Sequence, residues 1–394
     1  MKKIFYTLTI LTTLFFASSC QSDFWNDDYR GSGNTGTANG DGFSLRLSVP
    51  SGNISTRSTI APEDGEDVVH SLHLLFFEAT GEQAFRGHVT LCPGDYSNTF
   101  DLSEMIRVRF DSPLDYAENL NHHTHYTILV VANVDDYVVN SFTPYASMAE
   151  WLDSFKGMDL NAAINSRQLL VSAFHRGSQN NPDNNIICRN ELPMSAIVDR
   201  PANVEEVAAP LTRVVVRLDV ELHSRVARTH RVVSASVWNV PRYASLWRTP
   251  ANFPVAQIMR GYVQRVDASN NAYFYDSNRG IHGFFGGLYT FENRQTRISH
   301  GDHHTTAVII GLREVDENGN WVGEPEFHRV NVNLPFSGQN LQRNTVHNIR
   351  VNHILGPGTT GVTIAEAEDR AYNRNNSQLQ VSINDSDMDD RGVI

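Results

Sequence analysis

Apolar residues recur at every second position along much of the chain, which is the pattern of β-strands. In residues 211–222, alternate positions are aliphatic and most positions between them are charged. Residues 72–79 and 126–134 are apolar on both faces, as is typical of strands buried inside a sheet. Polar turns separate the further expected strands, at 232–240, 305–312, 328–334, 347–354 and 377–383. Many short strands between polar turns predict an all-β chain built of β-sandwiches.

Helical patterning is rare. A Thr-Pro start and near-helical apolar spacing predict one short helix within 143–155. The segment near 200–210 holds two prolines and three acids between apolar runs, so we expect a domain boundary there. The interpretation is an N-terminal sandwich at 58–205 and a C-terminal sandwich at 206–394.

An alternating strand lies close to each end of the chain. In the first, Phe43, Leu45, Leu47 and Val49 share one face, and a polar loop with a single arginine, Arg57, follows. The last strand presents a similar apolar face. Its side chains are Leu379, Val381 and Ile383.

The segment before the last strand, 356–376, is rich in Gly and Asn and is interpreted as a flexible loop. Each terminal strand can complete its own sheet. Alternatively, it can add to the sheet of a neighbouring molecule, as in donor-strand complementation.

The first nineteen residues are predicted to be an export leader. Lys2 and Lys3 precede an apolar run that is too short to span a bilayer. The small residues that lead directly into Cys20 resemble the lipobox of bacterial lipoproteins, although Ala17 stands where a leucine is common. The resemblance implies cleavage before Cys20 and acylation, including palmitate, at that residue. The alternative is an ordinary signal peptide with a chance cysteine.

Residues 20–42 are rich in Gly, Asn, Asp and Thr and are expected to form a flexible tether. The net charge of −12 argues against nucleic acid as a partner and against a basic membrane-binding patch. After Cys20 only Cys92 and Cys188 remain, and the sequence leaves open whether they pair.

Candidate catalytic and metal sites are weak. The histidine groups 122–125 and 300–304 lie in polar, turn-like stretches, and neither has a partner group at a known metal-site interval. The residues named for them are His122, His123, His125, His300, Asp302, His303 and His304. No nucleophile elbow, phosphate loop, dinucleotide fingerprint or CxxC occurs. We therefore expect no enzyme activity, no cofactor and no metal.

Taken in order, the motifs of the chain resemble the fimbrillins, the subunits of type V pili. They are the lipoprotein start, the alternating strand before Arg57, YTILVVANV (126–134), LPMSA (192–196) with LTRVVVRLDVEL (211–222), and LQRNTVHNIRVNHILGPGT (341–359). The resemblance implies two tandem transthyretin-like β-sandwich domains and export to the outer membrane as a surface lipoprotein. The acidic end of the chain lacks the tryptophan that some family members carry there.

The resemblance also implies how the subunits assemble. An arginine-specific protease cuts after Arg57, so Ser58 becomes the first residue. The strand bearing Phe43, Leu45, Leu47 and Val49 is then displaced, and a terminal strand of another subunit fills the groove. The expected donor side chains are Leu379, Val381 and Ile383.

Three functions follow as expectations. The first is a structural pilus subunit that supports adhesion to a host or bacterial surface receptor. The second is an uncleaved anchor held to the outer membrane through Cys20. The third is a surface lipoprotein that binds glycans through aromatic residues such as Trp238, Trp247 and Trp321, although these are more typical of buried sandwich positions.

Overall fold

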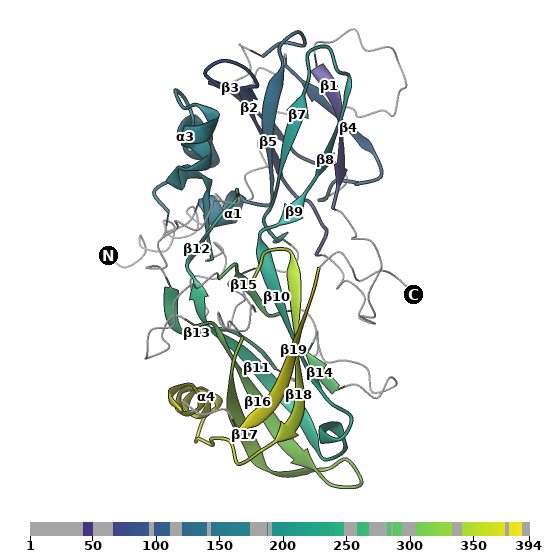
Figure 1. The fold of residues 1–394 in the computed structure, drawn as a ribbon, viewed down its shortest axis with the longest axis vertical. Coiled ribbons are helices and arrows are strands. Elements are labelled where there is room, and N and C mark those ends of the chain that lie inside the picture. Colours follow the sequence, from purple (N-terminus) through teal and green to yellow (C-terminus); the bar gives the residue numbers. More distant parts are fainter. Residues whose placement is uncertain are drawn as a thin grey trace, which may run out of the picture.

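The computed structural model is an all-β chain whose strands gather in two lobes along the long axis (Figure 1), as the strand patterning predicts. The structure describes residues 42–49, 66–93, 98–110, 120–139, 143–173, 187, 191–247, 258–267, 282–284, 287–293, 305–332, 341–374 and 378–387. Among these residues, no helix has the length and apolarity needed to cross a membrane.

The upper lobe packs a five-stranded sheet against a three-stranded one. The larger sheet runs in the order β3 (Phe85–Leu91), β2 (Leu72–Glu78), β5 (Tyr126–Ala132), β7 (Met194–Arg200) and β9 (Thr212–Arg213). The smaller sheet runs in the order β4 (Met105–Arg109), β1 (Gly42–Ser48) and β8 (Glu206–Pro210). Strand β2 is buried along almost its whole length because sheet neighbours flank it and the core covers it.

The lower lobe packs two larger sheets. The first holds β14 (His282–Phe284), β10 (Val215–Leu222), β18 (Thr345–Ile354) and β19 (Leu379–Asp387), with β15 (Tyr289–Phe291) also paired to β10. The second holds β13 (Ile258–Asp267), β11 (His230–Pro241), β16 (Ala307–Val315) and β17 (Trp321–Asn331). Aliphatic side chains from both sheets form the core of this lobe.

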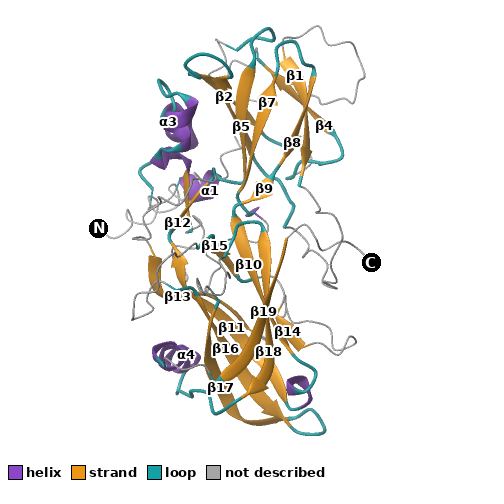
Figure 2. Cartoon of the chain, viewed as in Figure 1, coloured by secondary structure: helices purple, strands orange, loops and turns teal. Residues whose placement is uncertain are grey.

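Helices are short and lie outside the sheets (Figure 2). They are α1 (Asp135–Val138), α2 (Met148–Asp153), α3 (Leu160–Ile164), α4 (Ile364–Asn373) and the single turns η1 (Arg167–Leu169) and η4 (Val226–Arg228). The helix predicted within 143–155 is α2, and it begins later than expected because Ser147 accepts a hydrogen bond from the Glu150 amide as the N-cap. Strands β6 (Leu170–Ser172) and β12 (Tyr243–Ser245) form a separate two-stranded sheet.

The interpretation of residues 356–376 as a flexible loop is wrong, because α4 occupies much of this segment. Thr363 caps the helix by accepting from the Glu366 amide. On its inner face, Tyr372 stacks on Trp238 with ring centroids 4.7 Å apart, and buried Glu368 forms a bidentate ion pair with Arg265. The strand that follows is therefore joined to the lobe by a packed helix.

The charged face of β10 is also buried, beneath residues that come from the upper lobe and from β15. Arg217 is fully buried and donates to both carboxylate oxygens of Glu66 at 3.0 Å. It also makes a bidentate pair with Asp219, while the Tyr289 hydroxyl donates to Glu66 at 2.7 Å. The two carboxylates raise the pKa of Arg217, although burial opposes them. We name Glu66, Arg217, Asp219 and Tyr289 the junction cluster.

The pairing of β8 with β1, and of β9 with β7, joins residues as far as Arg213 to the upper lobe. The domain ranges 58–205 and 206–394 remain predictions.

Candidate strand-exchange site

Strand β1 occupies the middle of the three-stranded sheet, with a neighbour on each side. It pairs antiparallel with β4 from Gly42 to Arg46, and parallel with β8 from Ser44 to Ser48. Its backbone is therefore hydrogen-bonded along both edges. In Figure 1, β1 is the purple strand between β4 and β8. Removing a central strand of this kind leaves an open slot between its two neighbours, whereas removing an edge strand leaves the sheet one strand narrower.

The inward face of β1 is completely buried. Phe43 and Leu45 are 0 % exposed and Leu47 is 1 % exposed. Val49, just beyond the strand, is partly buried against the same core. Burying each such side chain contributes about 1.5–3 kcal/mol, so β1 is a substantial part of the upper core. The apolar face of β1 that the sequence alternation predicts is therefore present in the structure.

Phe43 lies in a pocket of aromatic rings. Its ring centroid is 6.3 Å from that of Phe76 and 5.9 Å from that of Phe110. These two rings meet each other edge to face at 5.7 Å, and each contacts Tyr126. Such edge-on and tilted contacts are favourable for aromatic quadrupoles.

A buried arginine completes this pocket. The guanidinium carbon of Arg200 lies 4.9 Å from the Phe43 ring centroid and 5.4 Å from that of Phe110. Arg200 is 0 % exposed, and its amino groups donate to the carbonyls of Thr124 and Val204 at 3.3 Å. These carbonyls, together with the His122 ring nitrogen Nδ1 at 2.9 Å, hold the cation against the two rings. We name Phe76, Phe110 and Arg200 the aromatic pocket.

The start of β1 needs a glycine. A Cβ on Gly42 would lie 2.1 Å from the carbonyl oxygen of Val108 in β4, which is closer than atoms can approach. The close pairing of Gly42 with Arg109 thus depends on the absence of a side chain.

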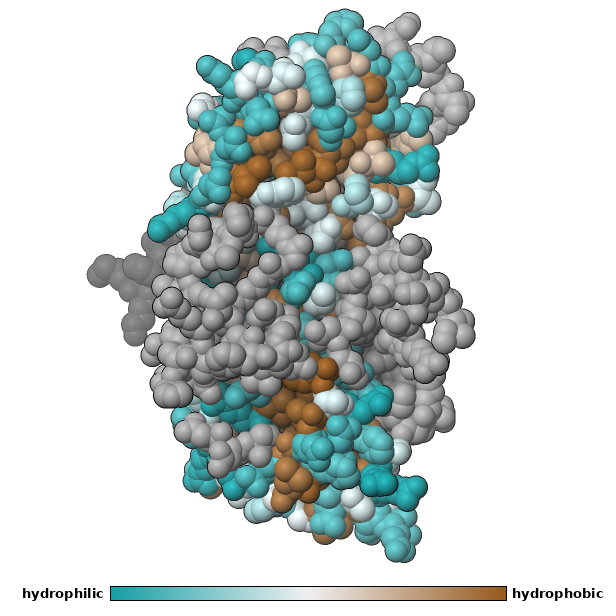
Figure 3. Space-filling model, in the orientation of Figure 1, coloured by the Kyte–Doolittle hydropathy of each residue, from teal (hydrophilic) through white to brown (hydrophobic). Residues whose placement is uncertain are grey.

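The last strand has a different position. Strand β19 pairs antiparallel with β18 from Leu379 to Asp387 and lies at the edge of its sheet. Leu379 is 5 % exposed, whereas Val381 and Ile383 are partly buried against the lower core. Figure 3 shows apolar surface over the part of the lower lobe where Figure 1 places β18 and β19. In the structure, both terminal strands pair within their own chain.

The processing residues Cys20, Arg57 and Ser58 lie outside the described residues, as do His300, Asp302, His303, His304 and Cys188. Their predicted roles stay predictions. The first described residue after the Arg57 segment is Glu66, which is buried in the junction cluster.

The described histidines of the 122–125 group lie in and next to the predicted turn, and each has a partner that is not a metal. His125 Nε2 lies 2.6 Å from Asp199 Oδ1, and His123 contacts the Asn203 side chain at 2.7 Å. Arg200 donates to His122 Nδ1 at 2.9 Å. Within the described part of the chain, no three histidine, cysteine or acidic side chains converge on a possible metal position.

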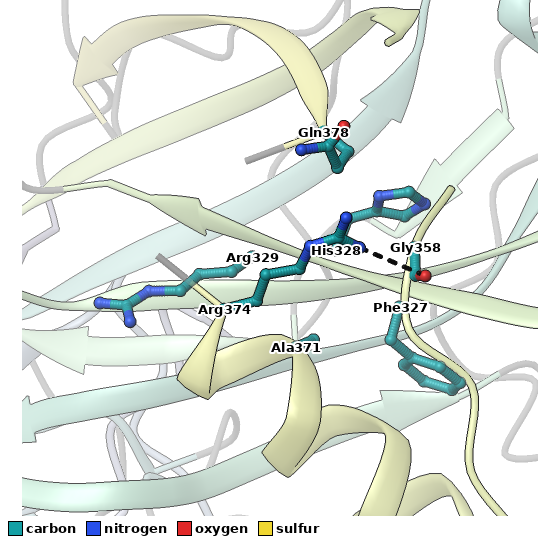
Figure 4. A pocket seen from close by; sticks show the side chains of 7 residues that line it. All are labelled: Phe327, His328, Arg329, Gly358, Ala371, Arg374 and Gln378. Carbon is teal, nitrogen blue, oxygen red and sulfur yellow. Dashed lines mark hydrogen bonds between the residues drawn. The ribbon is translucent and has the colours of Figure 1, made fainter. Parts of the chain in front are cut away.

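The hollows near α4 are small or open. The one in Figure 4, beside His328 and Gly358, has a volume of about 10 Å³, so it holds at most a water molecule. Arg374, which follows α4, reaches the Gly358 carbonyl across it. A second cavity of about 220 Å³ is lined by His230, Leu312, Glu314, Val322, Gly323, Glu324, Glu326, His328, Ile354 and Thr360.

Sequence reasoning missed the residues that surround β1. Arg200 follows a run of strand residues and carries no motif, and Phe76 and Phe110 read as ordinary core aromatics. Only the fold shows that these three side chains, far apart in the chain, converge on Phe43. A lone arginine at the end of an apolar strand was the one available signal.

Comparison with known proteins adds a likeness at the level of structure. No protein-family model matches the chain, and no curated protein matches it. A fimbrilin from Porphyromonas gingivalis W83 is 14% identical and aligns over 88% of this chain and 98% of its own, with a TM-score of 0.43.

Two further structures are similar over a large part of the chain. The tip fimbrial protein Mfa3 from Porphyromonas gingivalis, with a C-terminal truncation, is 14% identical and aligns over 82% of this chain and 96% of its own, with a TM-score of 0.41. A fimbrial assembly protein from Parabacteroides distasonis ATCC 8503 is 10% identical and aligns over 79% of this chain and 90% of its own, with a TM-score of 0.39. At these scores, the likeness does not by itself assign this chain a function.

Proposed function

We propose that the chain is a non-catalytic structural subunit of a cell-surface pilus, exported as a lipoprotein and assembled by strand exchange that proteolysis triggers. The observation that supports this most is the position of β1. It is a central strand whose inward face is fully buried, yet the 50–65 segment that follows it contains one arginine, Arg57, and no lysine. One cut after Arg57 separates β1 from the rest of the chain.

The physical consequence of that cut supports assembly. Loss of β1 leaves unpaired backbone edges on β4 and β8 and uncovers the apolar core between them. An exposed edge beside an apolar slot favours addition of a strand from another molecule. That strand supplies both the ladder hydrogen bonds and the side chains at every second position.

The cut is tested by mass spectrometry of protein extracted from the cell surface. A mature N-terminus at Ser58 supports the pilus subunit, and an intact acylated Cys20 instead supports an uncleaved anchor. Arg57→Ala is expected to block maturation. Arg30→Ala is the matched control, because a cut at Arg30 leaves β1 attached. Normal maturation of Arg57→Ala protein contradicts the proposal.

The proposed donor is the C-terminal strand with Leu379, Val381 and Ile383. Because β19 lies at a sheet edge, deleting residues 377–394 is expected to leave the monomer folded but to stop polymerisation. Folding is checked by circular dichroism and polymerisation by gel electrophoresis without heating. Normal polymers from the truncated chain would remove the donor role from this strand.

Glycan binding at the surface is a second candidate function. Trp321 is 47 % exposed, and its neighbour Val322 lines the 220 Å³ cavity, whereas Trp238 is buried and Trp247 is partly buried. Polysaccharide binding that Trp321→Ala abolishes, by a chain that forms no polymers, would favour this function over the pilus.

A further inference from the structure

We propose that the slot left by β1 selects an incoming strand with an aromatic side chain at the position of Phe43, and that Arg200 is the residue that determines this selectivity. This inference rests on the strand-exchange function proposed above. The partner it describes is a β-strand of another subunit. That strand carries an aromatic residue followed by aliphatic residues two and four positions further on, which take the places of Leu45 and Leu47.

The aromatic pocket is built on elements that stay behind when β1 leaves. Phe76 belongs to β2, Phe110 directly follows β4, and Arg200 ends β7. Phe76 and Phe110 also contact each other and Tyr126, so their positions do not depend on Phe43 alone. The pocket is therefore expected to persist in the open slot.

Arg200 makes the pocket selective rather than merely apolar. Its guanidinium is 0 % exposed and lies 4.9 Å from the Phe43 ring centroid. A buried cation over a ring face is stabilised by the ring quadrupole, and an aliphatic side chain supplies no such charge distribution. The pocket gains from Phe, Tyr or Trp an interaction that Leu, Ile or Val does not provide.

The orientation of Arg200 is set by acceptors outside β1. They are the His122 ring nitrogen Nδ1 at 2.9 Å and the carbonyls of Thr124 and Val204 at 3.3 Å. A guanidinium held by such acceptors remains in place when the ring above it is exchanged.

The chain's own C-terminal strand does not match this preference. Its proposed donor side chains are Leu379, Val381 and Ile383, and no aromatic residue occurs after Tyr372. The slot is thus better suited to a strand from a different subunit than to the tail of a second copy. The tail of a second copy is expected to enter the slot more weakly, so that in a mixture another subunit follows this one.

The test uses the uncut chain without its export leader, with a specific-protease site placed within residues 50–65, so that release of β1 does not depend on Arg57. The cut protein is titrated with fluorescent peptides of the sequence 42–49 that carry Phe, Trp or Leu at position 43. Dissociation constants are measured by anisotropy in wild-type and Arg200→Gln proteins, with Arg200→Lys as a second variant. A peptide with Leu47→Val serves as the control, because position 47 lies away from Arg200 along the strand.

We expect the Phe and Trp peptides to bind more tightly than the Leu peptide in the wild-type protein. The Phe-over-Leu ratio should fall by about 2- to 30-fold in Arg200→Gln, and the cost of Leu47→Val should be equal in both proteins. An unchanged Phe-over-Leu ratio overturns the role of Arg200. Equal binding of Phe and Leu peptides to wild-type protein overturns the selectivity but leaves strand exchange intact. If no peptide enters and mass spectrometry shows that the cut strand is retained, strand exchange itself fails.

Discussion

The two terminal strands look alike in sequence but hold opposite positions in the fold. Strand β1 lies between two neighbours and is buried on its inward face, whereas β19 has β18 as its neighbour at a sheet edge. Both alternate apolar and polar residues over about the same length. The difference lies in what each leaves behind. Loss of β1 opens a slot through a sheet, and loss of β19 moves the edge of a sheet inward by one strand.

This difference fits the complementary roles proposed for the two strands. A strand whose departure creates an unfilled slot is suited to be replaced, because the open state gains from any strand that fits. A strand whose departure leaves a folded sheet is suited to be donated, because its own lobe tolerates the loss. The junction cluster adds to this contrast, because Glu66 anchors the chain just after the segment that follows β1.

The largest expected effect is that of Phe43→Ala in the uncut chain. It removes a buried ring from the aromatic pocket and should lower the free energy of unfolding by about 3–5 kcal/mol. Arg46→Ala, on the exposed face of the same strand, should change it by less than about 0.5 kcal/mol. Chemical denaturation followed by fluorescence measures both. Similar small effects from the two variants would show that β1 is not part of the core.

Arg217→Met tests whether the junction cluster prevents the loss of β1 from disturbing the chain that follows it. It leaves Glu66 and Asp219 buried without their cation and should cost about 3 kcal/mol or more. Arg370→Met, which breaks an exposed pair with Glu366, should cost less than about 1 kcal/mol. Hydrogen exchange should show faster exchange of residues 66–71 in Arg217→Met but not in the control. Unchanged protection of that segment would argue against an anchor at Glu66.

Leu379→Ala provides the matching measurement for β19, the other strand of the comparison. The side chain is buried but belongs to an edge strand, so the expected cost is about 2 kcal/mol, below that of Phe43→Ala. The same denaturation measurement compares the two variants directly. A cost equal to or above that of Phe43→Ala would contradict the view that β19 is the more dispensable strand.

Acid is expected to weaken both lobes. Burial lowers the pKa of His88 on β3, in the lobe of β1, and of His328 on β17, in the lobe of β19, each to about 4 from 6.5. Below pH 6.5 the unfolded chain therefore takes up protons that the folded chain resists. Stability is fully present above pH 6.5 and declines as the pH falls toward 4, by up to about 1.4 kcal/mol per residue for one pH unit.

Denaturation at pH 6.5 and pH 5.5 measures this loss. His328→Gln should reduce the pH dependence. An identical pH dependence in wild type and His328→Gln would show that His328 does not resist protonation in the folded protein.

Alternation was sufficient to predict long strands such as β2, β5, β10 and β18 and the inward face of β1, because side chains on a strand alternate between faces with a fixed period of two. It did not predict α4, since Gly and Asn around that segment suggested a loop, while the helix is held by long-range contacts such as Tyr372 on Trp238. It also did not show that the charged face of β10 is buried. That burial depends on Glu66 and Tyr289, which lie far from Arg217 in sequence.

The exchange of β1 is tested most directly by cutting the purified protein with an arginine-specific protease and analysing the products by gel electrophoresis without heating and by mass spectrometry. We predict a ladder of oligomers in which each rung begins at Ser58 and lacks residues 42–49. Monomers that are fully cut after Arg57 but still retain the 42–49 strand, with no ladder at any concentration, would contradict the account.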